Sequence, residues 1–139
     1  MNILYDEKEG AICFEAEFPP GCPDRWVYPE MELSLPRENF KNAIGASFEI
    51  KCEADTPPKE SYFMLVMRRD IIAGKDNLPG NGEWHVRYPI PVRTWESRFV
   101  QFGEFVGDDP ANTKKIRIGL NPKDNRIRFW IRNLQLIYK

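Results

Sequence analysis

The chain has 139 residues and a formal net charge of -1, from 20 Lys and Arg against 21 Asp and Glu. Hydrophobic residues make up 42% of it, which argues against a disordered chain or a polybasic nucleic-acid-binding tail. No apolar run approaches the roughly 18 residues of a membrane helix, and residues 1–10 are acidic, unlike a signal peptide. We expect one globular domain over residues 1–139, either cytoplasmic or part of a longer secreted protein.

The elements expected in chain order are short strands. Twelve prolines and nine glycines interrupt the sequence, and no segment keeps a helical apolar period for ten residues. Alternating apolar residues predict strands near residues 11–18, 31–35, 48–52, 62–66, 84–90, 99–105, 116–120 and 127–131, with one helical turn over residues 37–42. Eight or nine such strands, separated by Pro, Gly, Asn and Asp turns, predict an all-β sandwich or barrel with almost no helix.

The three cysteines are Cys13, Cys22 and Cys52. They are too few and too scattered for a disulfide framework, and none belongs to a C-x-x-C pair typical of zinc or redox sites. Cys13 and Cys52 lie in strand-like segments, where a free cysteine usually behaves as a small buried apolar residue. Whether one disulfide forms is open at this point.

Charge is unevenly distributed along the chain. Residues 1–60 carry 13 acids and 6 bases, whereas residues 113–139 carry 8 bases and 1 acid. Binding of a nucleic acid would need clustered Lys and Arg side chains, as in the C-terminal segment. The same charge asymmetry is explained if the first and last strands pair in one sheet. Glu15 and Glu17 would then face Arg128 and Arg132. We expect neither a nucleic acid nor a membrane as partner, since the chain as a whole repels phosphate.

The usual catalytic motifs are missing. His85 is the only histidine, which excludes a multi-histidine metal site, and no P-loop, nucleophile elbow or H-E-x-x-H motif occurs. Two of the 21 acids will always lie at the spacing that glycosidases use, so such a pair carries no information. We therefore expect a binding function and no enzymatic activity. A small carbohydrate-active enzyme that uses two of the acids is a less favoured alternative.

Aromatic residues are more numerous than the core requires, with nine Phe, five Tyr and four Trp. Trp130 alternates with core residues and so faces outward, and Trp26 and Tyr28 lie between a proline-rich segment and the Met31 strand. Aromatic faces attract the C–H groups of sugar rings, and neighbouring guanidinium and imidazole groups can donate to sugar hydroxyls. The alternative for Trp130 is packing under a loop or under its arginines. The predicted ligand-binding residues from this pattern are Trp26, Tyr28, His85, Arg87, Arg128 and Trp130.

Three segments resemble jelly-roll carbohydrate-binding modules of the galactose-binding-domain-like group, which are appended to bacterial cellulases, xylanases and glucanases. The first is residues 43–51, AIGASFEIK, and the second is residues 82–96, GEWHVRYPIPVRTWE. The third is the closing pair, residues 116–121, IRIGLN, and 129–136, FWIRNLQL. The resemblance implies a jelly-roll sandwich of two antiparallel sheets.

The resemblance also implies ligands. Such modules bind glycans on a concave sheet face, and the matching positions here are Arg68, His85, Arg87 and Trp130. They often hold a structural calcium through an Asp of the closing strand and acids near the N-terminus. Here Asn133 stands at the position of that Asp, and Glu7 and Glu9 are the neighbouring candidates. An amide oxygen ligates calcium without bringing charge, so this departure weakens the expectation of a metal.

The function expected from these observations is non-catalytic binding of a polysaccharide or oligosaccharide of the β-glucan or hemicellulose class. The chain would target an associated glycoside hydrolase and act outside the cell or at its surface. The alternative is a structural accessory sandwich that packs against a catalytic domain of the same protein and binds no glycan.

Overall fold

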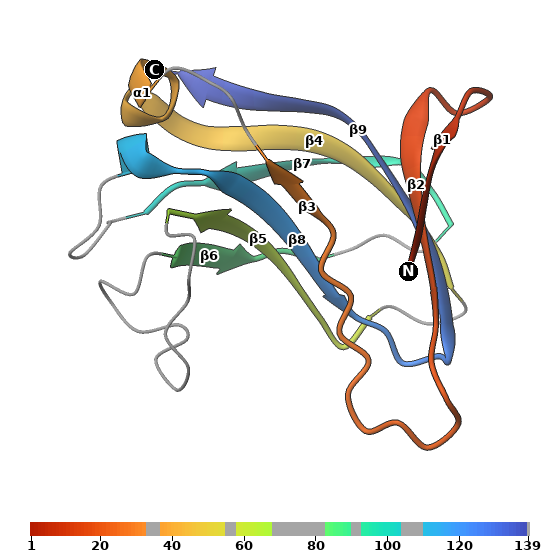
Figure 1. The fold of residues 1–139 in the computed structure, drawn as a ribbon. Coiled ribbons are helices and arrows are strands. Elements are labelled where there is room, and N and C mark those ends of the chain that lie inside the picture. The colour runs from red at the N-terminus through yellow and green to blue at the C-terminus, as the bar shows by residue number, and fades with distance from the viewer. Residues whose placement is uncertain (33–36, 55–57, 68–82, 90–92, 104–109, 139) are drawn as a thin grey trace.

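The fold is seen in a computed structural model that describes residues 1–32, 37–54, 58–67, 83–89, 93–103 and 110–138. Two antiparallel sheets face each other as the layers of a sandwich (Figure 1). Helix is confined, in these ranges, to one turn of α-helix, α1 (Arg37–Lys41), and a 3-10 turn at Pro110–Asn112. None of the helices in these ranges is long and apolar enough to span a bilayer. The sequence-based expectation of an all-β sandwich is confirmed.

The first sheet has five strands in the order β1-β2-β9-β4-β7. Their bounds are β1 (Asn2–Asp6), β2 (Ala11–Glu17), β9 (Arg126–Tyr138), β4 (Ala43–Glu53) and β7 (Glu96–Gln101). The expected pairing of the N-terminal and C-terminal segments is confirmed, because β2 lies antiparallel to β9 with Glu15 opposite Arg128. Glu17, however, lies opposite Arg126 and not Arg132.

The second sheet has four strands in the order β3-β8-β5-β6. Their bounds are β3 (Glu30–Glu32), β8 (Lys115–Asn121), β5 (Glu60–Val66) and β6 (Glu83–Arg87). A bridge between Val27 and Leu120 ties the chain just before β3 to β8. This bridge fixes residues 26–28 beside the centre of the sheet.

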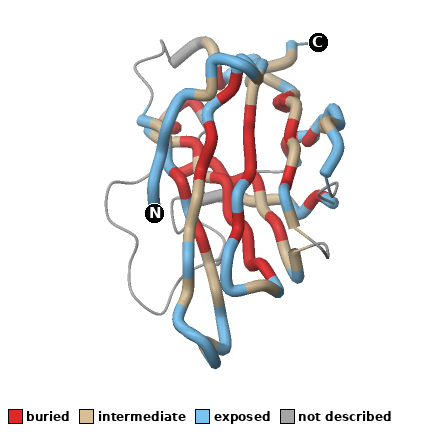
Figure 2. The backbone as a smooth tube through the Cα atoms, turned by 90° about the vertical axis from the view of Figure 1, so that its right-hand side faces the viewer, coloured by how far each residue is buried: buried red, intermediate tan, exposed pale blue. Residues whose placement is uncertain are grey.

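The core lies between the two sheets and is built from the alternating residues of the central strands. Ile118 and Leu120 of β8, Phe63 and Leu65 of β5, and Phe129 of β9 are at most 1% exposed. Period-two alternation predicts this, because every second side chain of a half-buried strand points to the same face. Figure 2 shows the buried residues gathered along the facing strands, with exposed residues at the turns.

Two elements differ from the sequence-based expectation. Strand β1 was not predicted, because residues 1–10 read as an acidic start, yet it forms a hairpin with β2 whose turn contains Gly10 at φ 62°. In β5 the period-two alternation over residues 62–66 predicts that Tyr62, Met64 and Val66 face inward. Phe63 and Leu65 pack in the main core, and Tyr62 instead lies on the outer face. Met64 and Val66 are buried as well, although they do not belong to the main core. The run is apolar at nearly every position, so periodicity alone does not choose the buried face.

Candidate functional site: an aromatic cluster on the outer face of the four-stranded sheet

Three aromatic rings stack on the outer face of the four-stranded sheet. Trp26 stacks on Tyr28 with ring centroids 5.3 Å apart and on Tyr62 with centroids 5.2 Å apart. The planes differ by 9° and 16° respectively, so the three rings are close to parallel. Trp26 is only half-buried and Tyr28 is 40% exposed. The sheet therefore presents a preformed aromatic surface, which we call the aromatic cluster, to solvent.

A glycine at the centre of β8 makes room for the aromatic cluster. A Cβ atom at Gly119 would lie 2.9 Å from Cε1 of Tyr28 and 3.5 Å from Cδ2 of Tyr62. Gly119 also pairs with Tyr62 across β8 and β5. Both tyrosine rings thus lean over a strand position that has no side chain, and this holds them close to the backbone of the sheet.

Polar groups border the aromatic cluster on the β6 side. The ring of His85 meets that of Tyr62 edge to face, with centroids 5.2 Å apart. The guanidinium of Arg87 lies over Tyr62 at 5.2 Å, and its Nη2 donates to the Tyr62 hydroxyl at 3.1 Å. The same Nη2 pairs with Glu60 at 3.0 Å, and the Arg87 side chain is 68% exposed. Arg87 can therefore be approached by a ligand while its partners hold its position.

A second set of charges borders the aromatic cluster on the β3 side. The Arg117 guanidinium lies 5.5 Å from the Tyr28 ring centre, and its Nε donates to Glu30 at 2.7 Å. Lys115 also donates to Glu30, at 3.3 Å. Burial alone would raise the pKa of Glu30, but the hydrogen bonds and charges of Arg117 and Lys115 outweigh it and hold that pKa below its usual value. Glu30 therefore stays ionised at neutral pH and orients both bases.

Four of the predicted ligand-binding residues meet in this one place, namely Trp26, Tyr28, His85 and Arg87. Sequence reasoning missed Tyr62, which connects them, because it was assigned to the buried face of β5. The signal that would have found it is its neighbour Phe63, since a Phe needs burial more than a Tyr whose hydroxyl has to be hydrogen-bonded. Arg68, the remaining position suggested by the family resemblance for this face, lies outside the described residues.

Trp130 lies on the other sheet and is not part of the aromatic cluster. As predicted, it faces away from the main core, but only 8% of it is exposed. Its Nε1 donates to Asp6 at 3.0 Å, and the Lys51 ammonium lies over its ring at 4.4 Å. Trp95 makes the matching contact, with its Nε1 donating to Glu9 at 2.9 Å. The expected exposed Trp130 surface is thus covered, because the β1–β2 hairpin is docked there.

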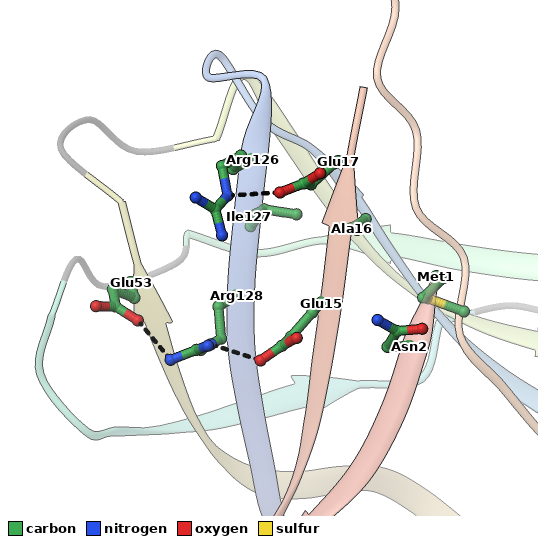
Figure 3. A pocket seen from close by; sticks show the side chains of 9 residues that line it. All are labelled: Met1, Asn2, Glu15, Ala16, Glu17, Glu53, Arg126, Ile127 and Arg128. Atoms are coloured by element: carbon green, nitrogen blue, oxygen red, sulfur yellow. Dashed lines mark ion pairs between the residues drawn. The ribbon is translucent and has the colours of Figure 1, made fainter. Parts of the chain in front are cut away.

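Arg128 lies on the outer face of the five-stranded sheet, beside a hollow of about 610 Å³ (Figure 3). It pairs with Glu15 at 2.8 Å and with Glu53 at 3.5 Å, and Arg126 pairs with Glu17 at 2.9 Å. The hollow therefore has both signs of charge along its wall. Its described lining has no aromatic ring, so it lacks the flat surface that sugar stacking needs.

The three candidate calcium ligands do not form a suitable donor set. Both carboxylate oxygens of Glu9 are engaged, one by Lys51 at 2.8 Å and the other by Trp95. Asn133 donates its amide to Glu49 and adopts φ 55° at a bulge between β4 and β9. Asn is favoured there because it tolerates the left-handed conformation. Glu7 is exposed at the hairpin turn, and no group of three or more His, Cys, Asp or Glu in the described ranges is arranged to hold a metal.

Comparison with known proteins supports the fold assignment. No family model matches the sequence, and no curated protein matches it. Among solved structures, the carbohydrate-binding module CtCBM11 is similar with a TM-score of 0.53 and 16% identity, over 99% of this chain and 81% of that one. The module TmCBM61, solved in complex with β-1,4-galactotriose, has a TM-score of 0.49 and 11% identity over the same shares. The chain thus has the jelly-roll fold found in carbohydrate-binding modules.

Proposed function

We propose that the protein is a non-catalytic carbohydrate-binding module whose ligand lies on the aromatic cluster. The observation that carries this proposal is the parallel stacking of Trp26, Tyr28 and Tyr62 in an exposed, preformed arrangement. A sugar ring gains free energy by laying its C–H groups against such rings, and little entropy is lost because the rings are already ordered. The likeness to CtCBM11 supports the fold that the proposal requires.

Hydrogen bonding would orient the sugar on the aromatic surface. His85 and Arg87 lie next to Tyr62 on one side, and Arg117 lies next to Tyr28 on the other. Planar guanidinium groups donate to two neighbouring hydroxyls, and an imidazole can donate or accept. Acids accompany the bases on this face, so the ligand that fits is an uncharged polyol rather than a strongly acidic polymer. We take a β-glucan or hemicellulose chain as the class of ligand.

The state of Glu30 on this face supports binding rather than hydrolysis. A glycosidase needs one carboxylic acid that is protonated near neutral pH, which requires a raised pKa. Burial would raise the pKa of Glu30, but the hydrogen bonds and charges of Arg117 and Lys115 hold it below its usual value. A module of this kind would act by holding an associated glycoside hydrolase near its polysaccharide, outside the cell or at its surface.

Affinity gel electrophoresis tests the proposal. The protein is run through native gels containing β-glucan, xyloglucan, xylan, mannan or galactan, beside the variants Trp26→Ala and Tyr62→Ala. Phe99→Ala is the matched control, because Phe99 is an aromatic residue of β7 that is 54% exposed and lies on the outer face of the other sheet. We expect one class of glycan to retard the parent and the control but neither cluster variant. Equal migration in every gel would contradict glycan binding and favour the structural accessory function.

A further inference from the structure

One edge of the five-stranded sheet lacks the protection that the other sheet edges have. Edge strands are usually blunted by charged residues, Pro or bulges, because their free N–H and C=O groups attract other strands. The edge strands β3, β6 and β7 each carry at least two charged or imidazole side chains within three to six residues. Strand β1 has the sequence NILYD, and it pairs with β2 in unbroken register.

The apolar side chains of this strand are exposed. Ile3 is 58% exposed, Leu4 44% and Tyr5 65%, and the strand is coloured as exposed over most of its length in Figure 2. Within the hairpin Ile3 lies opposite Phe14 and Tyr5 opposite Ile12. Since Phe14 belongs to the core, Ile3 and Tyr5 lie on the inner face of the sheet, where the second sheet does not cover them.

A small apolar hollow continues this uncovered face into the molecule. Its volume is about 230 Å³, and its lining combines residues of the β1–β2 hairpin with residues of the core. Its lining includes Tyr5, Ile12, Phe14, Met31, Ile131 and Leu134. An exposed edge and an adjoining apolar face together mark a protein–protein contact.

We propose that the partner at this edge is a second copy of the chain, bound by antiparallel pairing of the two β1 strands about a two-fold axis at Leu4. In this register Ile3 lies opposite Tyr5 of the second copy. Each row across the four strands then contains Phe14 and Ile3 of one chain followed by Tyr5 and Ile12 of the other. Every position in the row is apolar or aromatic. Aromatic and β-branched residues opposite each other are a favourable pair in antiparallel sheets.

The charges of this strand are compatible with a second copy. The same register places Asp6 opposite Asn2 of the other chain, so no like charges face each other across the junction. The Asp6 carboxylate is already held inside its own chain by the Glu9 amide and the Trp130 indole. The contact is isologous and therefore closes at two chains instead of forming a filament. This inference is independent of glycan binding.

The contact is small, so the dimer should be weak. Two five-residue strands bury less than the roughly 1,200 Å² of a stable interface, so we expect a weak, concentration-dependent dimer. Sedimentation velocity from about 10 μM to about 1 mM should show monomer giving way to dimer. Tyr5→Lys should raise the dissociation constant of the dimer at least 10-fold. The control Phe99→Lys, also on an exposed edge strand, should leave that constant unchanged. A monomer at all concentrations, or equal loss in both variants, would overturn the proposal.

A cross-linking experiment tests the register. In a Cys22→Ser background, chains carrying Ile3→Cys are mixed with chains carrying Tyr5→Cys and oxidised mildly. The proposed register brings these two positions face to face, so disulfide-linked heterodimers should exceed both homodimers several-fold. Circular dichroism checks that each variant is folded. A statistical mixture of the three dimers, or none, would contradict pairing about Leu4.

Discussion

Tyr28 lies against Gly119 so closely that a Cβ at position 119 would stand 2.9 Å from its Cε1 atom. The ring is held beside the sheet because β8 has no side chain at this point. Trp26 stacks on the other residues of the aromatic cluster from the same side of the sheet. The absence of a side chain at position 119 therefore leaves room for the Tyr28 ring beside the strand.

Replacing Gly119 by Ala should weaken glycan binding without unfolding the protein. Tyr28 is 40% exposed and can swing outward to relieve the contact, which separates it from Trp26. The loss of one aromatic contact predicts an affinity about 3- to 10-fold lower, measured by titration calorimetry. Thermal unfolding should change little.

Gly45→Ala is the matched control for this substitution. A Cβ at Gly45 would meet the carbonyl oxygen of Val100 and lie 2.8 Å from Cε2 of Phe99, and a backbone carbonyl in a strand cannot swing away. We expect a lower melting temperature and unchanged affinity of the folded protein. If Gly119→Ala behaves like Gly45→Ala, with lower stability and full affinity, the glycine supports the fold and not the site.

Trp130 should contribute to stability and not to binding. Because it is 8% exposed, Trp130→Ala should lower the free energy of unfolding by about 3 kcal/mol, measured by urea denaturation. Trp130→Phe keeps most of the packing and loses the hydrogen bond to Asp6, so its cost should be about 1 kcal/mol. Full stability together with lost glycan retardation in Trp130→Ala would restore this residue as a ligand-binding surface.

The docked hairpin should loosen in acid. Hydrogen bonds from the Glu9 amide and the Trp130 indole lower the pKa of Asp6, and Lys51 and Trp95 lower that of Glu9. A carboxylate whose pKa is lowered in the folded state stabilises the fold at any pH above its pKa in the unfolded chain, which is near 4. This stabilisation is lost as the pH falls through the pKa of the folded state. The melting temperature should therefore drop below about pH 4.

Asp6→Asn provides the control for this pH dependence. The amide oxygen still accepts hydrogen bonds but does not titrate, so the variant should lose less stability between about pH 5 and pH 3 than the parent protein. Differential scanning calorimetry across this range measures both slopes. Identical slopes would show that Asp6 does not contribute to the acid response.

Only one of the three cysteines should react quickly in the folded protein. All three are free, and burial raises the pKa of the Cys13 thiol and raises that of Cys52 to about 12. Cys22 is only partly buried and lies outside the strands. A thiol titration with Ellman's reagent should find one group in the native protein and three in denaturant. Rapid reaction of all three without denaturant would contradict the buried placement of Cys13 and Cys52.

Sequence patterns predicted the sandwich because its central strands alternate clearly. In β8 the apolar residues Ile116, Ile118 and Leu120 alternate with Lys115 and Arg117, so both the strand and its buried face follow from period two. The same alternation placed His85 and Arg87 outward. Pattern reasoning failed where both faces are apolar, as in β5, and Tyr62 was missed for that reason.

Long-range contacts were the other part that the sequence did not reveal. Alternation correctly predicts that Trp130 points away from the main core. The residues that cover it belong to a hairpin more than 100 residues away along the chain. Asp6 and Glu9 carry no local signal that they will accept hydrogen bonds from two indoles. Alternation therefore predicts the outward direction of Trp130 but leaves open whether it is exposed or covered, and in the fold the N-terminal hairpin docks on it.

The indole N–H signals of the four tryptophans in a proton–nitrogen correlation spectrum, assigned with single Trp→Phe variants, report which sheet binds the glycan. An oligosaccharide of the class that retards the protein in gels is added stepwise. We predict that the Trp26 signal shifts with saturation, while the Trp95 and Trp130 signals, held by Glu9 and Asp6, stay in place. Saturable shifts of the Trp130 signal with none at Trp26 would contradict glycan binding on the aromatic cluster and place the glycan on the other sheet.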